Sequence, residues 1–275
     1  MNAILALAMR EVREGIRNRW IIGATLALTL LAVTLAFLGS APAGAVKAPP
    51  LAVTVVSLSS LSIFLLPLIA LMLSFDGIAG EAERGTLLLL LSYPVSRGQI
   101  VAGKFLGYAI IIAIAVTVGY GSAGAAVALL QGGVEGAPAY LALIVSSIML
   151  GIAFAAIGIL ISAAVRERAV AAGISVAAWL VFVLLFDMAL LGVLAADANQ
   201  TISPAMLPYL LMLNPTDVYR FFNLTFIEDV RAFAGMSGLG GAVQLQPAML
   251  AAVMAAWIVI PLGLAALVFR RTAVR

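Results

Sequence analysis

The stretch FDGIAGEAERGTLLLLLSYPVSRGQIVAGK, residues 75–104, decides how this chain folds. Long apolar runs lie on both sides of it, whereas the stretch itself carries charges, glycines and one proline. A run of about 20 apolar residues is long enough to cross the hydrocarbon core of a bilayer. We therefore expect residues 75–104 to be a polar connection between two membrane spans.

The composition indicates that lipid surrounds most of the chain. Of the 275 residues, 64% are hydrophobic and 10% are charged, and the mean hydropathy is +1.20. Soluble domains carry about 25% charged residues. Because lipid cannot satisfy free backbone groups, the long apolar runs predict helices and an all-α membrane protein. Six runs are long enough to span: 20–38, 51–74, 105–130, 139–164, 169–196 and 248–269.

The basic residues predict the topology. Most of them fall in residues 1–19 and 76–104, around Arg166 and Arg168, and after residue 269. Because positive residues gather on the cytoplasmic side, both termini and residues 76–104 are expected in the cytoplasm. Counting residues 205–213 as a seventh span is rejected, because that run is too short to cross and would move the basic C-terminal end outside.

Residues 1–19 are expected to form an amphipathic elbow helix on the cytoplasmic membrane surface. Apolar side chains fall on one arc of such a helix and charged side chains on another. The apolar positions are Leu5, Met9, Val12 and Ile16. The alternative is a charged anchor that only fixes the topology. The dispersed charges and the lack of a cleavage site argue against a secretory signal peptide.

Local signals in residues 76–104 predict a helix, a break and a second helix. Asp76 is placed to cap the first helix, Pro94 is expected to end it near Tyr93, and Ser96 to Gln99 match a capping box for the second. About four residues would be enough to join two spans, so the extra length indicates contact with something else. The leucines at 87–91 must then be buried against the bundle, lipid or a partner.

Residues 197–247 form the largest segment expected outside the membrane. They are too apolar for a disordered linker, so we expect a compact cap or a re-entrant hairpin, with residues 205–213 dipping into the membrane surface. Thr225 and Glu228 match a helix start, which predicts a short helix from Thr225 to about Gly235.

The sequence argues against a catalytic, cofactor or metal site in this chain. Cysteine and histidine are absent, which removes thiol nucleophiles and Cys/His metal sites. Residues 98–105 resemble a phosphate-binding loop, but Phe105 stands where Ser or Thr is needed to hold magnesium. A serine hydrolase is the rival class, although the serines at 57–62 share no span with a lysine or aspartate. The methionines expected on the outer side have no tight spacing for copper: Met206, Met212, Met236 and Met249.

Two features inside the spans remain open to more than one interpretation. Asp187 is ionisable and lies in the apolar run 169–196, which makes it a candidate functional residue. It is equally interpretable as a protonated carboxyl bonded across helices or as a residue lying near the outer interface. Small residues in the third and fourth spans predict close helix packing, within the chain or between copies: Gly119, Gly121, Gly124, Gly151, Ala155 and Gly158.

DGIAGEAERGTL followed by LSYPVSRGQIVAGKFLG is similar to the signature of ABC-2 type permeases, the membrane subunits of ATP-binding-cassette transporters. The resemblance covers the whole chain as one domain, residues 1–275. It implies an elbow helix at 1–19, six spans, a cytoplasmic coupling segment at 76–104 and a periplasmic insertion at 197–247. It also implies a homodimer in the bacterial inner membrane, with no ATP-binding motif in this chain. Two cytoplasmic ATPase subunits would bind the ATP and magnesium.

The resemblance assigns ATPase docking to the coupling segment. Glu81, Glu83 and Arg84 would make charge-assisted hydrogen bonds, and glycines would let the two backbones approach. The residues of this chain that match the docking motif of the family are Asp76, Gly77, Gly80, Glu81, Glu83, Arg84, Gly85 and Thr86. Leu88 stands where many members carry an acidic residue, so no polar contact is expected there. The alternative is that these charges form a solvated face.

The stretch LNPTDVYRFFNL, residues 213–224, narrows the resemblance to permeases of the nitrous-oxide-reductase maturation system. The implied partner is a periplasmic β-helix protein that handles copper, with no nucleic acid involved. Contact with it would fall on Asn214, Pro215, Asp217, Tyr219 and Arg220. The permease would then either export a substrate or transmit movement to that protein. The alternative function is export of a lipid, a drug or another small molecule.

Overall fold

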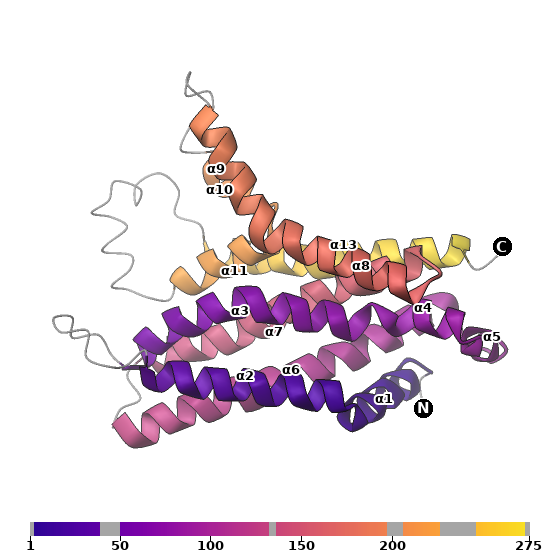
Figure 1. Cartoon of the computed structure of the whole chain (residues 1–275), viewed down its shortest axis with the longest axis horizontal. Coiled ribbons are helices and arrows are strands. Elements are labelled where there is room, and N and C mark those ends of the chain that lie inside the picture. The colour runs from indigo at the N-terminus through magenta and orange to yellow at the C-terminus, as the bar shows by residue number, and fades with distance from the viewer. Residues whose placement is uncertain (1–2, 39–49, 132–135, 197–205, 226–245, 273–275) are drawn as a thin grey trace.

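The computed structural model describes residues 3–38, 50–131, 136–196, 206–225 and 246–272, and every regular element in these ranges is helical (Figure 1). The elements are α1 (Ala3–Arg17), α2 (Arg19–Leu38), α3 (Pro50–Ser74), α4 (Asp76–Glu83), α5 (Thr86–Leu91), α6 (Arg97–Gln131), α7 (Ala137–Ala164), α8 (Arg168–Leu180), the π-helical η1 (Val181–Leu185), α9 (Phe186–Ala196), α10 (Leu207–Leu211), α11 (Pro215–Leu224) and α13 (Pro247–Thr272). The all-α prediction is therefore confirmed for the described residues.

The described helices provide five to six membrane spans. Five stretches are long and apolar enough to cross a bilayer: Thr54–Glu83, Arg97–Leu130, Ala137–Ala164, Arg168–Ala196 and Pro247–Arg271. The sixth expected span is α2, a helix of 20 residues that meets α1 at a bend of 69°. Composition and span length were therefore sufficient to predict this architecture from the sequence.

The spans lie side by side, and Figure 1 shows the basic segments gathered at one end of the bundle. That end holds α1, α4, α5, the junction between α7 and α8, and the last turn of α13. We call it the basic end. The arrangement follows from the sequence, because an even number of spans returns the chain to the side on which it started.

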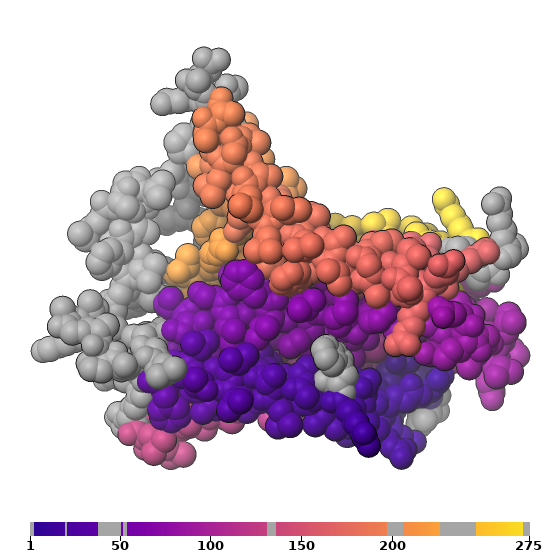
Figure 2. Space-filling model, viewed as in Figure 1, coloured from indigo at the N-terminus to yellow at the C-terminus, as the bar shows by residue number. Residues whose placement is uncertain are grey.

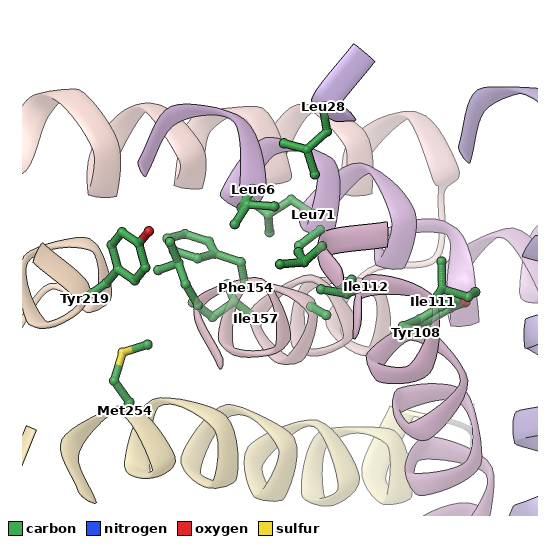
Figure 3. Close-up of a cluster of buried hydrophobic side chains, with 14 of the residues drawn as sticks. Leu28, Leu66, Leu71, Tyr108, Ile111, Ile112, Phe154, Ile157, Tyr219 and Met254 are labelled. Atoms are coloured by element: carbon green, nitrogen blue, oxygen red, sulfur yellow. The ribbon is translucent and has the colours of Figure 1, made fainter. Parts of the chain in front are cut away.

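The core is built around α7, which packs against α3, α6 and α13. Figure 3 shows Phe154 of α7 with Leu66 and Leu71 of α3 on one side and Met254 of α13 on the other. Gly151 lets α7 lie close to α6, since a Cβ there would be 2.6 Å from Ile112 of α6. Gly158, Gly119 and Gly124 likewise face Ser74, Thr29 and Tyr140, as the small-residue pattern predicted. Gly121 is the exception, because it faces open space.

Helix α1 lies against α6 on two glycines of the sequence GKFLG. A Cβ at Gly103 would lie 2.6 Å from the Leu7 Cβ, and one at Gly107 would lie 2.5 Å from the Glu11 Cβ. Leu5, Met9 and Ile16 of α1 are exposed, while Val12, predicted on the same arc, is buried. The amphipathic helix is therefore present, but it is seated on the bundle along one side rather than resting on lipid alone.

The predicted fifth span, 169–196, is not one regular helix. The π-helical turn η1 separates α8 from α9, and α9 rises away from the bundle with no buried residue (Figures 1 and 2). Hydrophobicity alone does not reveal such a turn, because the residues of η1, VFVLL, are as apolar as those of a regular helix. The Phe182 carbonyl of η1 accepts hydrogen bonds from the side chains of Asn214 and Thr216 at the start of α11.

Substituting Gly107→Ala is expected to destabilise the fold, because the added methyl overlaps the Glu11 Cβ and the Ala8 carbonyl. Overpacking of this kind costs about 1–3 kcal/mol. The matched control is Gly121→Ala on the same helix, which meets nothing within 4 Å. Thermal unfolding in detergent should show a lower Tm for Gly107→Ala and an equal or higher Tm for Gly121→Ala. Equal Tm values for the two variants would contradict the seating of α1 on α6.

Candidate functional site

The coupling segment folds as two short helices joined at Gly85. Helix α4 ends at Glu83, Gly85 has a φ of 72°, and α5 ends at Leu91 before Pro94. The predicted single helix from Asp76 to Tyr93 is therefore wrong at Gly85, where a left-handed residue turns the chain. The predicted capping box is confirmed, since Ser96 N donates to Gln99 Oε1 (2.8 Å) and Gln99 N donates to Ser96 Oγ (3.3 Å).

Asp76 does not cap α4, which corrects the sequence interpretation. The residue before it, Phe75, is already helical, and no side chain caps the helix there. Instead, the backbone amides of Ile78 and Ala79 both donate to Ser162 Oγ of α7, each at 2.9 Å. A serine 84 residues away along the chain therefore satisfies the amides that start α4.

A second anchor joins the coupling segment to the start of α8. Asp76 Oδ1 lies 3.1 Å from Arg168 Nε, and the Glu83 carboxylate accepts a hydrogen bond of 2.8 Å from the Arg168 backbone amide. The Arg168 guanidinium also lies 6.0 Å from the centre of the Phe75 ring. A carboxylate at a helix N-terminus is favourable because the free amides there carry partial positive charge.

The third anchor is a buried ion triad centred on Lys104. Its Nζ lies 2.6 Å from Glu11 Oε1 of α1 and 2.9 Å from Glu81 Oε1 of α4. The Lys104 side chain is 2% exposed, and both carboxylates are buried. Since an unpaired charge in such a place is costly, the triad ties the elbow helix, the coupling segment and α6 together.

The expected docking residues divide into an inward and an outward set. Gly77 and Gly80 are buried against Tyr108 and Asp76, and Glu81 points into the triad, so these three serve packing inside the chain. Asp76 is half-buried and engaged by Arg168. The exposed members are Glu83, Arg84, Gly85 and Thr86.

The leucine run 87–91 continues the exposed face. Leu87, Leu90 and Leu91 are partly buried against the core. Leu88 and Leu89 are 74% and 67% exposed, and Tyr93 is 66% exposed. Together with Arg84 and Thr86 they form a surface at the basic end that we call the coupling face. An apolar surface of this kind with a charged border is typical of a protein contact.

Helix α11 forms a second polar site, buried far from the coupling face. Asn214 caps the helix by accepting from the Thr216 amide, and its Nδ2 donates to the Phe182 carbonyl of η1 at 2.8 Å. The hydroxyls of Tyr219 and Ser147 lie 3.0 Å apart, and Ser146 donates to Asn223 at 3.0 Å. These bonds fix α11 against α7 and η1.

Asp187 pairs with Arg220 of α11 at 3.3 Å, and Arg220 also reaches Asp217 at 2.9 Å. Asp187 is therefore bonded across helices, but as the partner of a guanidinium rather than as the protonated carboxyl that the sequence interpretation offered. Of the residues expected to contact a periplasmic partner, Asn214, Pro215, Asp217 and Tyr219 are buried within the chain, and Arg220 is exposed. The helix predicted from Thr225 to Gly235 lies outside the described residues beyond Thr225, which ends α11.

Two of the serines weighed for catalysis, Ser60 and Ser62, bond to backbone carbonyls of their own helix. Ser62 bonds to the Leu58 carbonyl and lies 2.6 Å from the Tyr120 hydroxyl, with neither a lysine nor a carboxylate bonded to it. Among the methionines, Met206 and Met249 are exposed and Met212 is partly buried, whereas Met236 lies outside the described residues. The described His, Cys, Asp and Glu residues form no group of three that could hold a metal ion.

Several anchoring residues were not singled out from the sequence. The sequence places Lys104 in the basic stretch 76–104 and in the phosphate-loop-like stretch 98–105, and Ser162 inside the apolar run 139–164. The signal that was available for Lys104 is its position directly before the apolar run 105–130, where a lone ammonium at the edge of a span requires a carboxylate partner. Ser162 gives no comparable signal, because serine hydroxyls inside spans usually bond to their own helix.

The bundle, its bent coupling segment and its buried anchors define a multi-span helical membrane subunit. A family model described as "ABC-2 family transporter protein" matches residues 5–274. The chain therefore belongs to the ABC-2 transporter family, whose members are the membrane subunits of ABC transporters.

Curated relatives carry a more specific name. They include the "Probable ABC transporter permease protein NosY" of Stutzerimonas stutzeri and that of Pseudomonas aeruginosa. Each is 43% identical to this chain over 274 residues, which cover 98% of this chain and 99% of the relative.

Substituting Lys104→Met should destabilise the protein strongly, because Glu11 would be left buried without its cation and Glu81 would keep only the longer contact with Arg10, at 3.4 Å. Breaking a buried ion pair from one side costs about 3–5 kcal/mol. Thermal unfolding should show a large drop in Tm that Glu81→Gln partly restores in the same background. The control is Arg13→Met, an exposed basic residue of α1, which should leave the Tm nearly unchanged. A Lys104→Met variant as stable as this control would rule out the triad.

The cluster around Arg220 predicts unequal roles for its two carboxylates. Asp217 is 1% exposed and bonds to both Arg220 and Asn214, whereas Asp187 is 35% exposed and pairs with Arg220 at the longer distance of 3.3 Å. Asp217→Ala should cost about 1–3 kcal/mol, because it removes a buried acceptor shared by Asn214 and Arg220. Asp187→Ala should cost about 0–1 kcal/mol. Chemical denaturation would measure the loss of unfolding free energy in each variant. A larger loss for Asp187→Ala than for Asp217→Ala would contradict these roles.

Proposed function

We propose that this chain is the permease subunit that couples ATP hydrolysis by a separate cytoplasmic ABC ATPase to movement across the membrane. The observation that supports this most strongly is the coupling segment, which is anchored to α1, α6, α7 and α8 while it exposes the coupling face. A flexible loop would move with the ATPase without moving the spans. A segment tied to four helices would pass that movement to the spans.

The coupling face has the chemistry of a docking surface. Leu88, Leu89 and Tyr93 provide apolar area, and the exposed Arg84, which lies 3.5 Å from Asp76, provides a positive charge at its border for a carboxylate of the ATPase. The family and the basic residues of this end support placing it in the cytoplasm, with both termini on the same side. Two chains would form the membrane core, with one ATPase bound to each coupling face and ATP with magnesium held in the ATPases.

Helix α7 supports transmission as the mode of action. Ser162 near its last turn holds α4, and Ser147 in its first half holds Tyr219 of α11. The 15 residues between these serines correspond to about 22 Å of helix rise. We infer that a push on the coupling segment reaches α11 through this one rigid helix.

The relatives named NosY, together with residues 213–224, support a role in the maturation of nitrous oxide reductase. In this proposal, movement of α11 changes the 197–247 insertion, which acts on a periplasmic β-helix protein that handles copper. Copper would be held by that partner rather than by this chain. The competing function, export of a lipid, a drug or another small molecule, predicts ATP-dependent loss of a substrate from reconstituted vesicles.

Reversing the charge at the coupling face should separate the permease from its motor. Arg84→Glu, alone or with Leu88→Asp, is expected to lower the amount of cognate ATPase that co-purifies with the permease by at least about tenfold, as loss of a central contact would. Arg271→Glu is the matched control, since this exposed arginine of the basic end lies outside the coupling segment.

Unchanged ATPase stoichiometry and unchanged stimulation of ATP hydrolysis in both coupling-face variants would overturn the docking proposal. The role in maturation has a separate measurement. In cells that lack the native permease, this chain should restore the copper content of nitrous oxide reductase, and the Arg84→Glu variant should not. Full copper content in the absence of any permease would reject that role and leave the docking proposal standing.

A further inference from the structure

Three arginines around the junction of α1 and α2 have no partner within the part of the chain that the structure describes. Arg13 and Arg17 are exposed on α1, and Arg19 is exposed at the start of α2. No described carboxylate pairs with any of these guanidinium groups, whereas Arg10 on the same helix pairs with Glu14 at 2.8 Å. The unpaired charges therefore favour an anionic group outside the chain.

The exposed surface of α1 has a basic strip beside an apolar strip. Leu5, Met9 and Ile16 are exposed, and at 3.6 residues per turn they fall in one narrow sector of the helix. Arg13 and Arg17 fall in the next sector, away from the side that packs on α6. This pattern is typical of a helix that touches both the headgroups and the acyl chains of a membrane surface.

An apolar groove of about 210 Å³ begins at the end of α1 and runs along α2 and α6. The exposed side chains in its wall come from all three helices: Ile16 of α1, Ile22 and Leu26 of α2, and Ile114 of α6. Ile22 and Leu26 belong to the apolar run 20–38. In a membrane the groove therefore faces the acyl chains of the leaflet at the basic end.

The unpaired arginines border this groove at the end where the apolar run begins. Residues three apart on a helix are neighbours, so Arg13 lies beside Ile16 on α1. By the same spacing Arg19 lies beside Ile22 on α2. Because Arg19 directly precedes the apolar run 20–38, its guanidinium is level with the lipid phosphates when the groove is level with the acyl chains. A guanidinium suits a phosphate, since it can donate two parallel hydrogen bonds to it.

We propose that α1, the start of α2 and the groove form a binding site for an anionic phospholipid of the phosphatidylglycerol type. Arg13 and Arg19 bind the phosphate, Arg17 adds a third positive charge beside the headgroup, and one acyl chain lies in the groove. None of the described residues that line the groove is a carboxylate, so a headgroup that also carries an ammonium finds no partner for it there. This site is independent of the proposed coupling function.

The headgroup preference is the first test. The full-length chain, purified in detergent, is titrated with phosphatidylglycerol and with phosphatidylcholine that carry identical acyl chains, and bound lipid is counted by native mass spectrometry. Phosphatidylglycerol should bind at least about five-fold more tightly, the factor that one arginine contributes beside an anionic lipid. Equal affinity for the two lipids would overturn the proposal.

Paired variants test the role of the arginines. Arg13→Gln combined with Arg19→Gln should abolish the preference for phosphatidylglycerol while some lipid still binds through the groove. The matched control is Arg270→Gln combined with Arg271→Gln, which removes the same charge from another exposed site of the basic end and should keep the preference. All four side chains are exposed, so neither pair should lower the Tm. A preference that survives the first pair, or that both pairs abolish equally, would overturn the site.

A second set of measurements tests the groove and the lipid. Ala115→Phe fills the groove and should weaken binding of both lipids, whereas Ala125→Phe, the same change at an exposed site of α6 outside the groove, should not. The Tm of each variant shows that it is folded. Glycerol phosphate, the headgroup without acyl chains, should not displace the lipid. Displacement at the lipid's own working concentration, or equal lipid binding by the two folded variants, would overturn the lipid assignment.

The other anionic surface that could meet these arginines is an acidic face of the ATPase. The variant with Arg13→Gln and Arg19→Gln should therefore also be assayed for the amount of ATPase that co-purifies with it. We expect the full amount, because both residues lie outside the coupling face. Loss of the ATPase together with an unchanged lipid preference would assign the arginines to that protein and overturn the lipid site.

Discussion

The Lys104 ammonium, buried between Glu11 and Glu81, is the interaction on which the basic end of this protein depends. A charge in that position is tolerable only while both carboxylates stay in place. The three residues belong to three separate elements, α6, α1 and α4, so the triad fixes the elbow helix and the coupling segment relative to the third span. Gly103 and Gly107 make this possible by letting α1 lie directly against α6.

The coupling segment and α11 are held in place in the same way. At each of them a short helix outside the main spans is held by side-chain hydroxyls of α7, at Ser162 for α4 and at Ser147 for α11. Around α7 the core is filled by large side chains such as Phe154 and Leu150, so α7 has little room to bend between the two contacts. A stiff helix with a polar contact at each site suits the transmission of movement better than passage of a solute through the protomer.

The sequence was sufficient to predict the helical class, the spans and the place of the coupling segment, because apolar run length and basic residues are direct consequences of the lipid environment. The break at Gly85 was missed although glycine is the residue that adopts a positive φ at little cost, and the π-helical turn at Val181–Leu185 was missed because its residues are as apolar as those of a regular helix. Glu81 illustrates a different limit. Its charge suggested an exposed contact, and only the fold shows that it faces Lys104.

The central claim is that a separate ATPase grips the coupling face, and a site-specific cross-link tests it most directly. The chain has no cysteine, so Leu89→Cys introduces a single thiol at the centre of that face. A short photoreactive group on this thiol should cross-link to the ATPase in membranes, while the same group on Leu129→Cys, near the other end of α6, should not. Absence of an ATPase cross-link from position 89 in an assembled, active complex would contradict the account.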